Sequence, residues 1–165
     1  MLFSFKGTRL SRGLQIDEIS TLAPAWYVSL DIRPYGNTPS WSNVIHFTAD
    51  DENNSDHGSR VPAIFFHGNS RKLHICNPVN GNRNYCFNSE SLALNQYTKV
   101  EVRQHQLNDG RFQLEIKIGG ESVHTAINDK ARFFGNVKVY RSDLWYPTAN
   151  ALIKNLVYGN LPYGK

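Results

Sequence analysis

Long apolar runs are missing from this sequence of 165 residues. No stretch approaches the roughly 18 consecutive apolar residues that a membrane-spanning helix needs, so we expect no membrane span. The opening segment, MLFSFKGTRLSRG, does not resemble a signal peptide, because Lys6 and Arg9 interrupt its short apolar part. We therefore expect a chain that either has lost a leader or never had one.

Clusters of basic residues are also missing. Lys and Arg number 18 against 14 Asp and Glu, and they are scattered rather than interleaved with aromatic residues. This pattern predicts no nucleic-acid partner. Apolar residues make up 40% and charged residues 19%, which is typical of a globular chain and not of a disordered one. We expect residues 1–165 to form a single domain with a sizeable core.

Helical periodicity is nearly absent, and short strand-like patterns take its place. Ala25–Arg33 alternates strictly, with Trp26, Val28, Leu30 and Ile32 on one face, as in a half-buried antiparallel strand. The segment SESLAL, near residue 92, offers one helical turn at most. Further strands are predicted at Leu2–Lys6, Leu14–Ile19, Trp41–Thr48, Val61–Phe66, Tyr97–Leu107, Arg111–Ile118, Glu121–Ile127, Asn136–Arg141 and Ala151–Tyr158. So many short strands predict an all-β, antiparallel two-sheet sandwich.

Cysteine occurs only twice, as Cys76 and Cys86, in the segment LHICNPVNGNRNYCF. Asn80–Gly81 predicts a tight hairpin turn between them. A strict two-residue turn would pair Cys76 with Tyr85, whereas a three-residue turn or one bulge would pair it with Cys86. The apolar alternation favours the second register and a disulfide worth about 2–3 kcal/mol, formed in an oxidising compartment. Two unpaired thiols are the alternative.

A polar loop, Ala49–Arg60, interrupts two of the apolar runs and carries four acidic residues. Carboxylate oxygens suit Ca²⁺, so Asp50, Asp51 and Asp56 are candidate metal ligands, although the spacing matches no EF-hand. His57 lies in the same loop and could join a metal or ligand site. The alternative is a solvated hairpin loop without metal.

Two loops contain the candidate residues for ligand binding. Arg60 could pair with Asp143, either as a structural salt bridge or as a guanidinium that Asp143 orients toward a polar ligand. Trp145 and Tyr146 could stack on sugar faces or could plug the end of the sandwich.

The order of the sequence blocks resembles the concanavalin A-like jelly roll, in particular the laminin G-like and galectin-like domains of extracellular animal proteins. The blocks are WSNVIHFT, GSRVPAIFFH, LHIC with NGNRNYCF, NDGRFQLEIKIGGE and FFGNVKVYRSDLWYPTANALIKNL. They cover nearly the whole chain. The resemblance implies a two-sheet jelly roll in a secreted protein. The galectin pattern His-x-Asn-x-Arg is not repeated, since Thr48 and Asp50 follow His46. The Glu-x-Asp-x-Glu triplet of related glucanases is absent, so we expect no enzyme.

These observations predict a secreted, lectin-like module that binds a glycan or glycoprotein. The expected site combines Asp50, His57, Arg60 and Asp143 as hydrogen-bonding groups with Trp145 or Tyr146 as a stacking face, so Trp145→Ala should abolish binding. The alternative function is a structural or adhesion module that binds protein or forms a homo-oligomer through an edge strand such as Leu2–Lys6.

Overall fold

The computed structural model describes residues 2–3 and 7–164, and its regular elements are all strands. The strands are β1 (Leu2–Phe3), β2 (Thr8–Arg9), β3 (Gln15–Leu22), β4 (Trp26–Pro34), β5 (Ser42–Thr48), β6 (Ala63–Phe66), β7 (Lys72–Val79), β8 (Asn82–Ser91), β9 (Thr98–Gln106), β10 (Phe112–Ile118), β11 (Glu121–Asn128), β12 (Phe134–Tyr140) and β13 (Ala151–Asn160). Within these residues no helix is long and apolar enough to cross a membrane.

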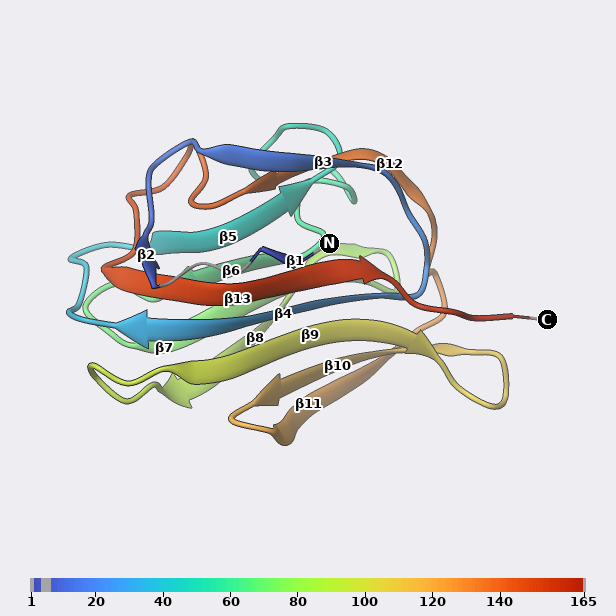
Figure 1. Cartoon of the computed structure of the whole chain (residues 1–165). Coiled ribbons are helices and arrows are strands. Elements are labelled where there is room, and N and C mark those ends of the chain that lie inside the picture. The colour runs from blue at the N-terminus through green and yellow to red at the C-terminus, as the bar shows by residue number, and fades with distance from the viewer. Residues whose placement is uncertain (1, 4–6, 165) are drawn as a thin grey trace.

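The strands form two antiparallel sheets that pack face to face (Figure 1). Sheet A has the order β1-β13-β4-β9-β10-β11, with β2 also paired to β13. Sheet B has the order β3-β12-β5-β6-β7-β8. Each sheet combines consecutive hairpins with pairs that are distant in sequence, such as β13-β4 and β12-β5, as in a jelly roll, and the predicted antiparallel sandwich is confirmed.

The alternation in β4 shows why the sheets pack. Trp26, Val28, Leu30 and Ile32 are buried, while the residues between them are only partly buried, as the sequence predicted. Side chains of this face meet inward-facing residues of sheet B in one hydrophobic cluster, which includes Phe47. Apolar surface from both sheets is thus removed from water in a single layer.

The two central strands of sheet B are unusual because they are buried on both faces. Every residue of β5 and of β6 is buried. On the outer face, Ala63, Phe65 and Cys76 form a second apolar cluster, against which Cys86 and Tyr146 pack. Loops must therefore cover the outer face of sheet B, and these loops contain the candidate functional residues.

The hairpin between β7 and β8 confirms the predicted disulfide between Cys76 and Cys86. Asn80 and Gly81 both adopt positive φ angles, 52° and 82°, as a type I′ turn requires. The register shifts between Asn77 and Val79, and this bulge brings Cys76 opposite Cys86.

One local prediction needs correction. SESLAL contains no helical turn: β8 continues through Ser91, which pairs with Lys72, and Leu92 donates its N–H to the Arg71 carbonyl. Pairing with β7 thus satisfies backbone groups that a helix would otherwise use. Of the predicted Leu2–Lys6 strand, Leu2–Phe3 pairs with β13, and residues 4–6 lie outside the described residues.

Candidate functional site

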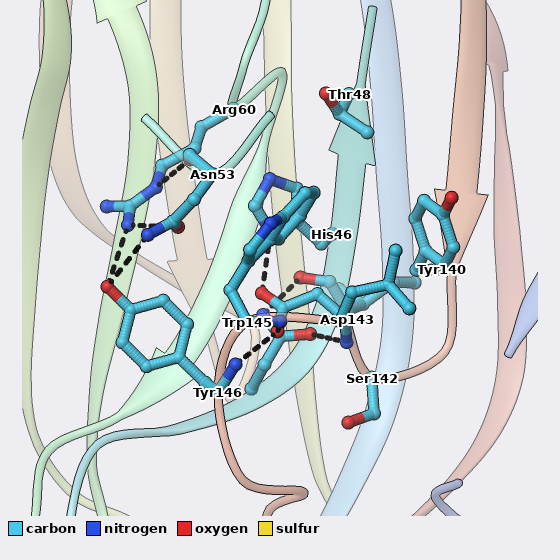
Figure 2. Close-up of polar contacts among 12 residues, drawn as sticks. His46, Thr48, Asn53, Arg60, Tyr140, Ser142, Asp143, Trp145 and Tyr146 are labelled. Carbon is cyan, nitrogen blue, oxygen red and sulfur yellow. Dashed lines mark hydrogen bonds and ion pairs between the residues drawn. The ribbon is translucent and has the colours of Figure 1, made fainter. Parts of the chain in front are cut away.

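The Asp50–Arg60 and Ser142–Asn150 loops meet over the outer face of sheet B (Figure 2). The Tyr146 hydroxyl accepts hydrogen bonds from Asn53 Nδ2 and from an Arg60 terminal nitrogen, each at 3.3 Å. The second loop is attached at its base, where Ser142 donates its N–H to the Val44 carbonyl. The polar loop therefore folds onto the sheet instead of projecting into solvent.

Asp50 organises the polar loop through three hydrogen bonds to its carboxylate. Its carboxylate accepts hydrogen bonds from Thr48 Oγ1 at 3.0 Å, Ser59 Oγ at 2.7 Å and the Glu52 N–H at 3.0 Å. Short side-chain bonds of this kind stabilise turns at the expense of extended strand. Asp50 is therefore a turn-forming residue, and its acceptor sites are directed at its own loop.

The three candidate Ca²⁺ ligands do not gather into one site, and this corrects the prediction. Asp51 instead binds Lys138 and Tyr140, and Asp56 accepts the N–H of the adjacent His57 at 2.7 Å. Each carboxylate has a local partner, and a lysine neutralises one of them. In the described chain, His74, Cys76 and Cys86 are the only three potential metal ligands that lie close together, and both cysteines are in the disulfide.

Asp51 links the polar loop to β12. Its hydrogen bond from Lys138 Nζ, at 2.9 Å, and that from the Tyr140 hydroxyl, at 2.8 Å, lower the pKa of the Asp51 carboxyl. Burial and the same hydrogen bond raise the pKa of Tyr140 to about 12. A carboxyl whose pKa is lower in the folded state stabilises that state when it is ionised.

Asp51→Asn should therefore reduce stability near neutral pH by no more than about 1 kcal/mol, because the ion pair is partly exposed. The contribution of Asp51 is fully present above the unfolded-state pKa near 3.8 and is lost as the pH falls through the folded-state value. Urea unfolding at pH 7 and at pH 3 should show that the gap between wild type and variant narrows in acid. Asp129→Asn, at an exposed site on another loop, is the control, and a gap that widens in acid would contradict the assignment.

Asp143 is buried beneath the second loop and binds His46. The two side chains are 0% exposed, and Asp143 Oδ2 lies 2.8 Å from His46 Nδ1. The other carboxylate oxygen accepts the N–H groups of Trp145, at 3.1 Å, and Tyr146, at 2.9 Å. This turn directs the carboxylate inward, so the predicted Arg60–Asp143 pair is wrong and Asp143 cannot reach a ligand.

His46 has a hydrogen-bond partner at each ring nitrogen. Nε2 lies 2.6 Å from the Ser59 carbonyl oxygen, which can only accept a hydrogen bond. Nδ1 shares a proton with the Asp143 carboxylate, whose second oxygen already accepts two backbone N–H groups. The pair therefore joins β5 to both loops. Trp145 is half-buried over it, with its ring centroid 5.1 Å from that of His46.

Arg60 is a positioning residue with no donor left for a ligand. It is 5% exposed, its guanidinium lies 4.7 Å from the centroid of the Phe65 ring, and burial lowers its pKa. Its five N–H groups match five acceptors. These are the backbone and side-chain oxygens of Asn53, the side-chain oxygen of Asn84, the Tyr146 hydroxyl and the Cys76 sulfur.

Beside Arg60 lies a pocket of about 200 Å³ on the outer face of sheet B, here called the outer pocket. Its lining residues are Trp41, Asn54, Arg60, Phe65, His74, Asn84 and Tyr146. Trp41 is 39% exposed, and its ring centroid lies 4.3 Å from that of His67 and 4.7 Å from that of His74. The Trp41 indole thus packs against the imidazole rings of His67 and His74, while part of it stays exposed to solvent.

The outer pocket offers both hydrogen-bond donors and acceptors. Asn54 Oδ1 is buried without a partner among the described residues. The Tyr146 hydroxyl accepts two hydrogen bonds, which leaves its own hydrogen available, and within residues 7–164 Asn84 Nδ2 has no acceptor. Burial lowers the pKa of His74, which favours its neutral form. The lining includes no carboxylate.

Two of the predicted site residues, Arg60 and Tyr146, line the outer pocket, whereas sequence reasoning did not single out Trp41, Asn54 and Asn84. Trp41 was counted as part of an apolar strand, although it directly follows the turn formers Pro39 and Ser40, which would have marked it as a residue at a strand end. Of the other candidates, Trp145 does not line this pocket, and His57 lies in a different pocket.

The sequence matches no protein-family model and no curated protein. Solved structures do match the fold. A heptameric SAP-like pentraxin from Limulus polyphemus superposes with a TM-score of 0.59 at 12% identity, over 98% of this chain and 77% of that one. The chain has the concanavalin A-like jelly-roll fold.

Two further structures share this jelly roll. The binding domain of botulinum neurotoxin DC, solved in complex with SialylT, has a TM-score of 0.55 at 14% identity, over 84% of this chain and 33% of that one. Domain 4 of the arabinanase AbnA from Geobacillus stearothermophilus, in complex with arabinotriose, has a TM-score of 0.54 at 15% identity, over 90% and 66%. The chain thus spans only a third of the toxin structure, and at these identities the comparison concerns the fold alone.

Proposed function

We propose that the protein is a non-catalytic carbohydrate-binding module whose outer pocket holds an uncharged sugar unit. One observation carries the proposal: the exposed face of Trp41 lies in the same pocket as the unpartnered oxygen of Asn54. An aromatic face together with a few fixed polar groups is the usual composition of a sugar site.

In this proposal each lining group has a defined role. Trp41 stacks on the apolar face of the sugar ring, and Asn54 Oδ1 accepts a hydrogen bond from a sugar hydroxyl. Tyr146 and Asn84 donate to sugar oxygens. Arg60 holds Tyr146 and Asn84 in place through hydrogen bonds at 3.3 and 2.9 Å.

Binding rather than cleavage fits this pocket. Glycoside hydrolysis generally needs two carboxyl groups beside the scissile bond, and no carboxylate lines the outer pocket. Two of the jelly rolls named above were solved with SialylT and with arabinotriose, which favours a glycan or glycoprotein partner. The disulfide favours an oxidising, secretory location.

Trp41→Ala should weaken glycan binding by roughly tenfold or more, because loss of a stacking ring costs on the order of 1–2 kcal/mol. A glycan array identifies the ligand, and titration calorimetry then measures the affinity of the wild type and of the variant for that glycan. Trp145→Ala is the matched control, because Trp145 lies outside the outer pocket. Circular dichroism verifies that both variants fold.

The opposite ranking, with binding lost in Trp145→Ala and kept in Trp41→Ala, would move the site to the Ser142–Asn150 loop. An array without any bound glycan would contradict the proposal. A concentration-dependent increase in size would then favour the alternative function, an adhesion module that forms homo-oligomers.

A further inference from the structure

A second pocket lies at the end of the sandwich where β4 begins and where β7, β9 and β11 end. It has a volume of about 240 Å³ and is here called the end pocket. It shares no lining residue with the outer pocket. His57, which the sequence marked as a candidate, is part of its lining.

The floor of the end pocket is polar, but most of its polar groups already form hydrogen bonds within the protein. Gln104 and Asn128 are 3% and 4% exposed, and Gln104 Oε1 accepts a hydrogen bond from Asn128 Nδ2 at 2.8 Å. Gln104 Nε2 donates to the Pro24 carbonyl, and Asn128 Oδ1 accepts the N–H of Asn80. These amides therefore form a fixed frame rather than a set of free ligand groups.

Asn77 is the exception in this frame. It is 3% exposed and faces the interior, because it lies one residue beyond the outward-facing Cys76. Its Nδ2 donates to the Pro78 carbonyl at 3.1 Å, but its Oδ1 has no donor among the described residues. A buried acceptor without a partner costs free energy, and a ligand hydroxyl would remove that cost.

The rim of the end pocket is positively charged. Lys130 and Arg132 are exposed lining residues, and no Asp or Glu belongs to the lining. Neither cation forms an ion pair within residues 7–164. A Cβ placed on Gly81 would lie 3.3 Å from Lys130 Nζ, so the ammonium group lies over the β7–β8 turn. Arg132 lies 5.3 Å from the centroid of the Phe134 ring.

We propose that the end pocket is a second ligand site that takes an acidic sugar unit. A sugar hydroxyl donates to Asn77 Oδ1, and the acid group meets Lys130 and Arg132 at the rim. A simple anion has no hydrogen to donate to Asn77, and a neutral sugar leaves both cations unused, so only a ligand with both features fits fully. The volume is below the roughly 300–1,000 Å³ of pockets for drug-sized ligands, which limits the ligand to about one ring.

The test is titration calorimetry of the whole protein with glucuronate, glucose and acetate. Glucuronate should bind at least tenfold more tightly than either of the others. Acetate binding equal to that of glucuronate would reveal a non-specific anion effect, and equal glucose binding would remove the role of charge. Either result, or the absence of any binding at millimolar glucuronate, overturns the proposal. A hexose 6-sulfate titrated alongside identifies whether a carboxylate or a sulfate is preferred.

The double variant Lys130→Gln/Arg132→Gln should weaken glucuronate binding at least tenfold, and both sites are exposed enough for the fold to persist. Lys72→Gln/Arg9→Gln makes the same charge change at exposed positions outside the end pocket and should leave binding unchanged. Trp41→Ala should also leave it unchanged, so failure of the outer pocket and failure of the end pocket are distinguishable. Full binding by the first variant would overturn the proposal.

Discussion

Asp143→Ala should lower the free energy of unfolding by about 3–5 kcal/mol, the cost typical of removing one partner from a buried, hydrogen-bonded pair of ionisable groups. The substitution leaves His46 Nδ1 without its hydrogen-bond partner in a site that is 0% exposed. It also removes the acceptor of the Trp145 and Tyr146 N–H groups, and so weakens the turn inside the second loop. Urea unfolding followed by tryptophan fluorescence measures the loss.

Asp143→Asn is the informative companion variant. Its side-chain oxygen can still accept the two backbone N–H groups, and its Nδ2 lies where the second carboxylate oxygen contacted His46 Nδ1. We expect a smaller loss than for alanine. A double-mutant cycle with His46→Ala should show that the two alanine substitutions together cost less than the sum of the single costs. A loss below 1 kcal/mol for Asp143→Ala would contradict a coupled buried pair.

Cys76→Ser/Cys86→Ser should cost about 3 kcal/mol, the loop-closure value for a disulfide between residues ten apart. The bond joins the edge strand β8 to β7, and Cys76 belongs to the outer apolar cluster, so the change also places a hydroxyl in that cluster. Denaturant unfolding with and without dithiothreitol measures the effect. Reductant should lower the wild-type midpoint toward that of the variant.

The variant itself supplies the control for this experiment, because its unfolding midpoint should not respond to reductant. A wild-type midpoint that is insensitive to dithiothreitol, under conditions where thiol titration shows two free cysteines, would mean that the bond adds nothing to stability.

The fold was predictable because its signals are local. Alternation in Ala25–Arg33 identified the inward face of β4, and Asn80–Gly81 with one bulge favoured Cys86 as the partner of Cys76. Each of these inferences needs only neighbouring residues and the geometry of one strand or turn.

The site was much less predictable because its contacts join distant segments. Asp143 binds His46, which lies 97 residues earlier, and no spacing rule distinguishes this pairing from the predicted one with Arg60. Trp41 looked like a strand residue because an aromatic side chain next to an apolar run usually is one. Burial of β5 on both faces was the decisive fact, and it depends on where two loops fold.

The disulfide also has a consequence for where the protein can work. Asn84, which lines the outer pocket, lies two residues before Cys86 on β8, an edge strand that pairs with β7 alone among the described strands. A chain whose disulfide is reduced is therefore expected to keep its two-sheet sandwich. The end of β8 near Asn84 should fray, and ligand binding at the outer pocket should weaken. The proposed sugar affinity would then depend on the redox state of the surroundings, and a reducing compartment would abolish it before the protein unfolds.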